Sequence, residues 1–227
     1  MKWILWMLVV LTAALFLSAA PPEKPLKAAG SVELKDSAGD MNPITTSDGE
    51  EPPLDVVLLA IKSDGKRITL DATLNDPPGR FASAPVTLYI DSDNNAATGV
   101  KIGFEGPTGF EYKAELAMCI KYSDGSEACS GGSTKGKPKE RYGAVNLERF
   151  KGKSNYEEKE TVIDSMGFPG SKASVQTPVN GKVVEASFEY ADLKVKPGQT
   201  LRILAQETGG SAKDDSGYFP IILLTLK

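Results

Sequence analysis

Residues 86–99 read Val-Thr-Leu-Tyr-Ile-Asp-Ser-Asp-Asn-Asn-Ala-Ala-Thr-Gly. Val86, Leu88 and Ile90 alternate with a threonine and a tyrosine, which is the period of a strand with one apolar face. The apolar run ends at Asp91, and a series of polar residues follows. The stretch therefore predicts a strand that leads directly into a loop rich in side-chain oxygen atoms.

This loop places candidate cation ligands on alternate residues. Asp91, Asp93 and Asn95 occupy its positions 1, 3 and 5, and Thr98 adds a hydroxyl. Oxygen atoms with this spacing can converge on a hard cation such as calcium, which takes ~6–8 oxygen ligands at ~2.3–2.6 Å. Two carboxylates so close in sequence repel each other unless positive charge lies between them. Glu111, after the next glycine-rich stretch, adds a further ligand, and together these five residues predict a calcium site.

An ordinary polar turn is the alternative interpretation of the same loop. Asp and Asn are favoured in turns because their side chains hydrogen-bond the nearby backbone. The loop also departs from the calcium loop of helix-loop-helix proteins, which has Gly at position 6 and Glu at position 12. This chain has Ala96 and Ile102 there. A calcium site here would thus belong to a sheet rather than to a pair of helices.

The composition excludes several kinds of chemistry. The chain has 227 residues, 41% of them hydrophobic, and no histidine. The missing histidine excludes Ser-His-Asp and Cys-His catalysis as well as zinc and haem held by histidine. The formal net charge of −4 argues against a nucleic-acid partner, which requires a basic surface. Carboxylate chemistry and metal binding through oxygen atoms remain open.

The N-terminus predicts export. Residues 1–20 read as a signal peptide, because a single lysine precedes an uncharged apolar run at 3–20. Pro21 disfavours cleavage after this run, which is close to the minimum length for spanning a membrane, so an uncleaved membrane anchor is the alternative. Residues 21–30 predict a proline-rich linker and residues 31–227 a single domain. We therefore expect a domain outside the cytoplasm that is secreted, periplasmic or membrane-anchored.

The two cysteines predict a disulfide. Cys119 and Cys129 flank Asp124-Gly125, a dipeptide typical of hairpin turns. Each cysteine lies about five residues from this turn, so a hairpin would place the two thiols opposite each other on neighbouring strands. Disulfides are common in exported proteins. Two unpaired thiols are the alternative.

Turn signals at short, regular spacing predict an all-β fold. Between them, short segments with alternating polarity predict about ten strands, and no long helix is expected outside the N-terminal segment. This pattern favours an antiparallel β-sandwich. The expected strands lie at residues 32–34, 54–61, 67–74, 86–90, 110–122, 144–150, 161–164, 173–177, 182–190, 200–206 and 218–226.

The order of these segments resembles the DOMON-like β-sandwich superfamily, which includes the family-nine carbohydrate-binding modules. The resemblance covers residues 31–227 and implies a jelly-roll-like sandwich with a structural calcium ion. Some members bind sugars and others bind haem, but the missing histidine argues against haem here. The resemblance rests on the motifs at residues 32–40, 54–56, 88–99, 109–112, 188–193 and 213–218.

The sequence as a whole predicts an exported, non-catalytic, calcium-stabilised binding module with carbohydrate as a candidate ligand. Sugar-binding surfaces favour flat aromatic rings, yet both tryptophans lie in the N-terminal apolar run. Tyrosines are therefore the candidate sugar platforms, although ordinary packing is the alternative for each. The candidates are Tyr112, Tyr142, Tyr156 and Tyr218.

Two other functions remain as alternatives. The first is a structural or assembly component of the cell envelope that binds a protein partner. The second is a glycoside hydrolase or lyase that uses carboxylates, with catalytic groups ~5–9.5 Å apart. Glu111 and Glu115 would lie on one strand ~13 Å apart at ~3.3 Å per residue, which disfavours this second alternative.

Overall fold

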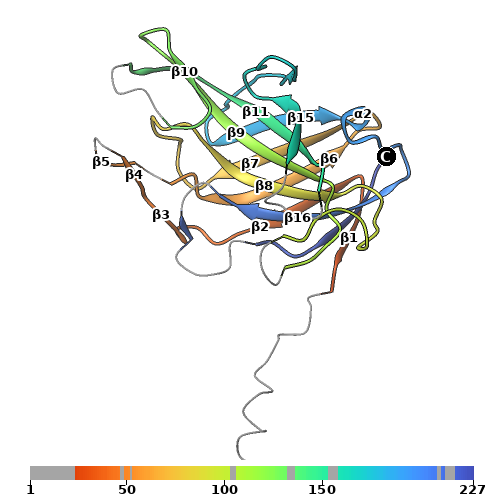
Figure 1. Cartoon of the computed structure of the whole chain (residues 1–227). Coiled ribbons are helices and arrows are strands. Elements are labelled where there is room, and N and C mark those ends of the chain that lie inside the picture. The colour runs from red at the N-terminus through yellow and green to blue at the C-terminus, as the bar shows by residue number, and fades with distance from the viewer. Residues whose placement is uncertain are drawn as a thin grey trace, which may run out of the picture.

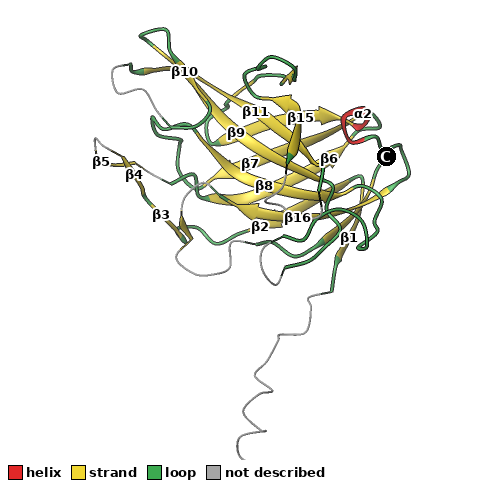
Figure 2. Cartoon of the chain, in the orientation of Figure 1, coloured by secondary structure: helices red, strands yellow, loops and turns green. Residues whose placement is uncertain are grey.

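The structure is a computed structural model, and it describes residues 24–46, 49–51, 53–102, 106–131, 136–152, 158–208, 211–212 and 218–227. In these ranges the chain is almost entirely β-structure, with one short helix, α2 (Tyr190–Leu193) (Figure 2). None of the helices described is long and apolar enough to cross a membrane. The N-terminal apolar run at residues 3–20, the loop at 213–217 and Tyr156 lie outside the described residues.

The two main sheets form the β-sandwich that the sequence predicts (Figure 1). The small sheet has the strand order β15-β7-β6-β2, and every pairing in it is antiparallel. Its strands are β2 (Ser31–Lys35), β6 (Val56–Ser63), β7 (Arg67–Leu74) and β15 (Val183–Glu189).

The large sheet has the order β1-β18-β16-β8-β9-β11-β12-β13, with β10 beside β9 and β14 beside β11. All of its pairings are antiparallel except β1 with β18 and β12 with β13. Its strands are β1 (Leu26–Ala29), β8 (Ser83–Asp91), β9 (Tyr112–Tyr122), β10 (Glu127–Ala128), β11 (Pro138–Phe150), β12 (Lys159–Asp164), β13 (Lys172–Ala173), β14 (Thr177–Pro178), β16 (Thr200–Glu207) and β18 (Ile222–Thr225).

Four further short strands form two separate pairs. β3 (Met41–Asn42) pairs with β17 (Ser211–Ala212), and β4 (Ile44–Thr46) pairs with β5 (Gly49–Glu51). The described residues thus contain eighteen strands, more than the ten or so expected, because several are only two or three residues long. Such short pairings leave no alternating pattern in the sequence.

The core lies between the two sheets. In β7, every second side chain is buried, as the alternation in its sequence predicts. In β8, Val86, Leu88 and Ile90 are completely buried and belong to the same apolar cluster as Ile68 and Leu70 of β7. Burial of each such side chain stabilises the fold by ~1.5–3 kcal/mol. The apolar face of residues 86–90 therefore anchors the strand that carries the polar loop.

β1 lies within residues 21–30, where the sequence predicts a linker. The backbone N–H of Leu26 donates to the carbonyl of Ile221 at 2.8 Å, and that of Gly30 donates to the carbonyl of Thr225 at 2.8 Å. The side chains of β1 are mostly exposed. Because backbone hydrogen bonds rather than a buried face hold this strand, no apolar periodicity marks it in the sequence.

The predicted disulfide is confirmed. Cys119 in β9 is bonded to Cys129, which directly follows β10, and their Cα atoms lie 4.0 Å apart. The turn between the two strands contains Asp124 and Gly125, and Gly125 has a φ of +85°. A glycine adopts this left-handed conformation without steric strain. The hairpin inferred from the Asp-Gly dipeptide thus brings the two cysteines together.

Candidate metal centre

Three carboxylates meet where β8 ends and β9 begins. Asp91 is the last residue of β8, Asp93 lies in the loop that follows, and Glu111 directly precedes β9. One oxygen atom from each of the three lies within 4.8 Å of the other two. Because β8 and β9 are antiparallel neighbours, the loop between them returns Glu111 to the end of β8. The structure therefore brings together the three acidic residues selected from the sequence.

An apolar cluster holds this loop against the outer face of the large sheet. Val100, Ile102 and Phe110 of the loop are buried, and they pack with Phe150 and Leu204. Backbone hydrogen bonds between Val100 and Phe110 close the loop, with 2.8 Å between the Val100 nitrogen and the Phe110 carbonyl oxygen. The apolar half of the loop thus fixes where its acidic half lies.

Asp91 is fully buried and bound to an arginine. Arg202 lies opposite Asp91 on the neighbouring strand β16, and its Nε donates to Asp91 Oδ2 at 2.9 Å. Burial raises the pKa of Asp91, and the hydrogen bond from Arg202 opposes this rise. The guanidinium also lies over the Phe110 ring, 4.8 Å from its centroid. One side of the Asp91 carboxylate is thereby occupied, while Oδ1 accepts from the backbone of the loop.

Glu111 accepts several hydrogen bonds from the same loop. The backbone N–H of Ser92 donates to Oε2 at 2.7 Å, and the Ser92 hydroxyl lies 3.1 Å from the same oxygen. The Thr98 hydroxyl lies 2.9 Å from Oε1. Burial raises the pKa of Glu111, and these donors act in the opposite direction. Glu111 is thus held in place from both of its oxygen atoms.

The Thr98 hydroxyl faces more acceptors than it can satisfy. Its oxygen lies 3.0 and 3.1 Å from the two carboxylate oxygens of Asp93, 2.8 Å from the carbonyl of Asn95 and 2.9 Å from Glu111. A hydroxyl carries a single proton, so it can donate to one of these four oxygens at a time. The centre of the loop therefore has an excess of oxygen acceptors over donors.

The predicted ligand Asn95 forms the hydrogen bonds of a polar turn. Its side-chain oxygen accepts from the backbone N–H of Ala97 at 3.1 Å, as in a polar turn. Its own N–H donates to Asp93 Oδ1 at 2.9 Å and to Asp91 Oδ1 at 3.1 Å. The backbone at Asn95 therefore has the hydrogen bonds of a polar turn. The convergence of Asp91, Asp93 and Glu111 is the feature that a cation site requires.

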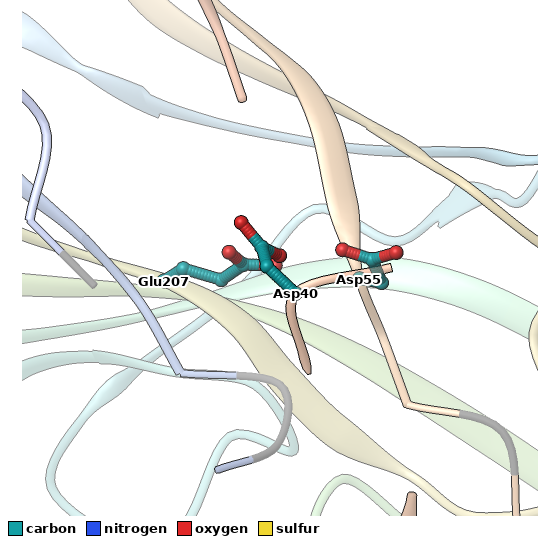
Figure 3. Close-up of side chains that lie close together, drawn as sticks. All are labelled: Asp40, Asp55 and Glu207. Atoms are coloured by element: carbon teal, nitrogen blue, oxygen red, sulfur yellow. The ribbon is translucent and has the colours of Figure 1, made fainter. Parts of the chain in front are cut away.

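A second acidic cluster was not selected from the sequence. It contains Asp40, Asp55 and Glu207, whose oxygens also lie within 4.8 Å of one another (Figure 3). Burial and the nearby carboxylates of Asp36 and Asp40 raise the pKa of Glu207 from 4.5 to about 8. One sequence feature could have indicated this cluster, namely an acidic residue at the end of an apolar strand. Asp55 directly precedes β6, and Glu207 is the last residue of β16.

The tyrosines offer few exposed rings. Tyr112 and Tyr142 are 3% and 1% exposed, so both are core residues rather than surface platforms. Tyr218 is 48% exposed. Among the described candidates, it alone could present its ring to a ligand.

Comparisons with known proteins identify no relative of this chain. No family model matches it, and neither a curated protein nor a solved structure gives a significant match. The resemblance to the DOMON-like superfamily therefore stays a prediction.

Proposed function

We propose that this protein is an exported, non-catalytic β-sandwich binding module whose loop after β8 is held by calcium. The observation that supports this proposal is the convergence of Asp91, Asp93 and Glu111 around the Thr98 hydroxyl, with oxygens of the three carboxylates within 4.8 Å of one another. Three carboxylates and a hydroxyl are hard oxygen ligands of the kind that calcium prefers. Water and backbone carbonyls would complete the coordination.

A structural rather than catalytic role fits the surroundings of these carboxylates. Asp91 has no exposed surface and is bound to Arg202, so it is not accessible to a substrate. The outward-facing member, Asp93, lies on an exposed loop. A glycosidase needs two carboxyl groups that both reach the glycosidic bond. The cluster is therefore better suited to holding the loop than to cleaving a bound sugar.

Carbohydrate is the ligand class that we propose for the open groove between the β6–β7 turn and α2. Its lining includes Asp64, Lys66, Arg67 and Glu189, which offer several hydrogen-bonding groups to sugar hydroxyls. Tyr190 also lines the groove, but its side chain is buried. Polar contacts rather than ring stacking would therefore dominate recognition. A glycan array probed with the calcium-saturated protein tests this ligand class.

An envelope protein is the alternative partner, and a different surface supports it. Met166, Phe168 and Val175 are 44%, 60% and 53% exposed, and they flank β13 at the edge of the large sheet. Exposed apolar side chains near one another are typical of protein interaction sites. Phe168→Ser would weaken binding to such a partner and leave glycan binding unchanged.

The calcium proposal is tested by thermal melts of the full chain in calcium and in excess chelator. A ligand that binds only the folded state stabilises it by ~2.7 kcal/mol at a hundredfold excess over Kd. For a domain of this size, 1 kcal/mol shifts Tm by ~2–4 °C. We therefore expect calcium to raise Tm by several degrees, and Asp93→Ala to reduce this rise.

Asp64→Ala provides the matched control. Asp64 is another exposed turn residue whose carboxylate accepts two backbone N–H groups, from Lys66 and Arg67. It belongs to neither acidic cluster, so its variant should keep the full calcium response. Equal calcium responses in the wild-type protein and in Asp93→Ala would refute calcium binding at this loop.

A further inference from the structure

The second acidic cluster is built from three distant parts of the chain. Asp40 directly precedes β3, Asp55 directly precedes β6, and Glu207 is the last residue of β16. Figure 3 shows their carboxyl groups gathered in one place, and their oxygens lie within 4.8 Å of one another. The cluster therefore lies where the small sheet, the large sheet and the β2–β3 segment meet.

Burial distinguishes this cluster from ordinary surface acids. Asp55 is 2% exposed and Glu207 is 6% exposed. Asp55 Oδ1 is buried and has no hydrogen-bond partner, and the same holds for Asp40 Oδ1. A buried carboxylate oxygen without a donor is strongly unfavourable, because burial removes its hydrogen bonds to water and no protein donor replaces them. These oxygens belong to a cluster of three carboxyl groups, in which a bound cation would supply the positive charge that they lack.

Among the residues that the structure describes, two backbone N–H groups compensate these carboxylates. The backbone N–H of Gly39 donates to Asp55 Oδ2 at 2.7 Å, and that of Val56 donates to Glu207 Oε1 at 2.6 Å. In the described ranges, no lysine or arginine forms an ion pair with any of the three acids. Asp36, on the other side of the β2–β3 turn, adds a further negative charge close to Glu207.

We propose that Asp40, Asp55 and Glu207 bind a divalent cation, calcium, at a site separate from the loop after β8. One carboxylate oxygen of each of the three residues serves as a protein ligand, since these oxygens lie within 4.8 Å of one another. This site does not depend on calcium at Asp91, Asp93 and Glu111, because the two clusters have no residue in common.

Calcium suits this site better than magnesium does. Magnesium requires near-octahedral geometry and usually keeps several water molecules, whereas calcium accepts irregular shells of carboxylate and carbonyl oxygens. Two of the three ligands here are almost completely buried, which leaves little room for water. The cation would join β6 of the small sheet to β16 of the large sheet and would fix the β2–β3 segment against both.

Isothermal titration of the chelator-treated full chain with calcium chloride tests this proposal, with magnesium chloride as the comparison. We expect two calcium sites in the wild-type protein and one in Asp55→Asn, which keeps an acceptor for Gly39. Asp93→Asn/Glu111→Gln should retain one site. Asp71→Asn is the matched control, because Asp71 also has a buried unpartnered oxygen but pairs with Lys62 and lies outside both clusters.

The double variant keeps the test decisive even if substitutions in the second cluster prevent folding. One calcium bound per chain in Asp93→Asn/Glu111→Gln, lost again when Glu207→Gln is added, supports the proposal. No calcium bound in that double variant overturns it, as does unchanged binding in both Asp55→Asn and Glu207→Gln. A wild-type protein that binds a single ion, kept in the double variant and lost in Asp55→Asn, supports this site and refutes the one after β8.

Discussion

The two acidic clusters lie at opposite ends of the same pair of strands. β16 runs antiparallel to β8, with Arg202 opposite Asp91 at one end and Glu207 opposite Val86 at the other. At ~3.3 Å per residue, the clusters are ~17 Å apart along the strands. Each brings three carboxylates within 4.8 Å. They therefore have the same acidic composition in different surroundings.

The first cluster is largely compensated by the protein itself. Arg202, the Ser92 backbone and the Thr98 hydroxyl all donate to its carboxylates. From the described part of the chain, the second cluster receives two backbone N–H bonds, and it keeps buried oxygens without partners. The donors around a cluster, rather than its number of acids, therefore set how strongly a bound cation would stabilise it. Cation removal should therefore disturb the second cluster more than the first.

The largest expected effect comes from breaking the buried ion pair between Asp91 and Arg202 in the first cluster. Asp91→Ala leaves Arg202 largely buried without its carboxylate, and breaking a buried ion pair in this way costs ~3–5 kcal/mol. The loss should appear both in calcium and in chelator, because the arginine is unpaired in either condition. Urea unfolding followed by circular dichroism measures it. A loss below ~1 kcal/mol, the range of exposed pairs, would show that Arg202 does not compensate this cluster.

A smaller effect is expected from Glu207→Gln in the second cluster. The variant should melt above the wild-type protein in chelator and below it in calcium. Burial raises the pKa of Glu207 from 4.5 to about 8. A raised carboxyl pKa means that its contribution to stability is complete below pH ~4.5 and is lost as pH rises through ~8. In chelator, the wild-type Tm should therefore fall over this range, and Glu207→Gln should melt a few degrees higher than the wild type at pH ~8.5.

In calcium, the wild-type protein should melt at a higher temperature than Glu207→Gln. The cation would neutralise the wild-type carboxylates, whereas the glutamine variant would lack one ligand. Thermal melts in calcium and in chelator at about pH 5 and pH 8.5 measure both effects. Glu115→Gln is a suitable control, since Glu115 pairs with Lys113 and belongs to neither cluster. If the Tm of the wild-type protein and the Tm of Glu207→Gln depend on pH in the same way in chelator, ionisation of Glu207 does not destabilise this cluster.

The smallest effect is expected from Thr98→Val. The variant loses one hydrogen-bond donor, which is worth ~1 kcal/mol, and it also loses one proposed calcium ligand. Thr108→Val is a matched control in the same loop, since that hydroxyl donates to the carbonyl of Ala96 rather than to a carboxylate. Both variants should unfold at slightly lower urea concentrations, but only Thr98→Val should weaken the calcium response. Equal calcium responses would exclude Thr98 as a ligand.

Local sequence signals predicted most of the long strands. The expected strand at residues 67–74 coincides with β7, because every second side chain of that segment enters the core. The segment at 173–177 is different, since only β13 and β14 at its two ends form short pairings. β1 was not expected because its side chains are mostly exposed. Periodicity thus identifies strands that bury a face and misses strands held by backbone hydrogen bonds alone.

The first cluster could be found from the sequence because its acids lie close together in the chain. Asp91 and Asp93 are two residues apart, and Glu111 directly precedes the next strand of the sheet. The second cluster has no such local pattern, because Asp55 and Glu207 are separated by about two thirds of the chain. The pairing of Arg202 with Asp91 could not be predicted from the sequence either, because only the register of β16 against β8 places the two residues side by side.

Residues close together in the chain specify the alternating apolar faces, the tight turns, the disulfide and the grouping of acids after residue 90. These features depend on neighbours within a few residues, whose geometry the covalent chain fixes. The packing of distant strands, in contrast, sets which carboxylates are buried, which of them pair with an arginine and which keep unpartnered oxygens. Burial and pairing arise only when distant strands are brought into register, and they set the electrostatic cost that a bound cation would relieve.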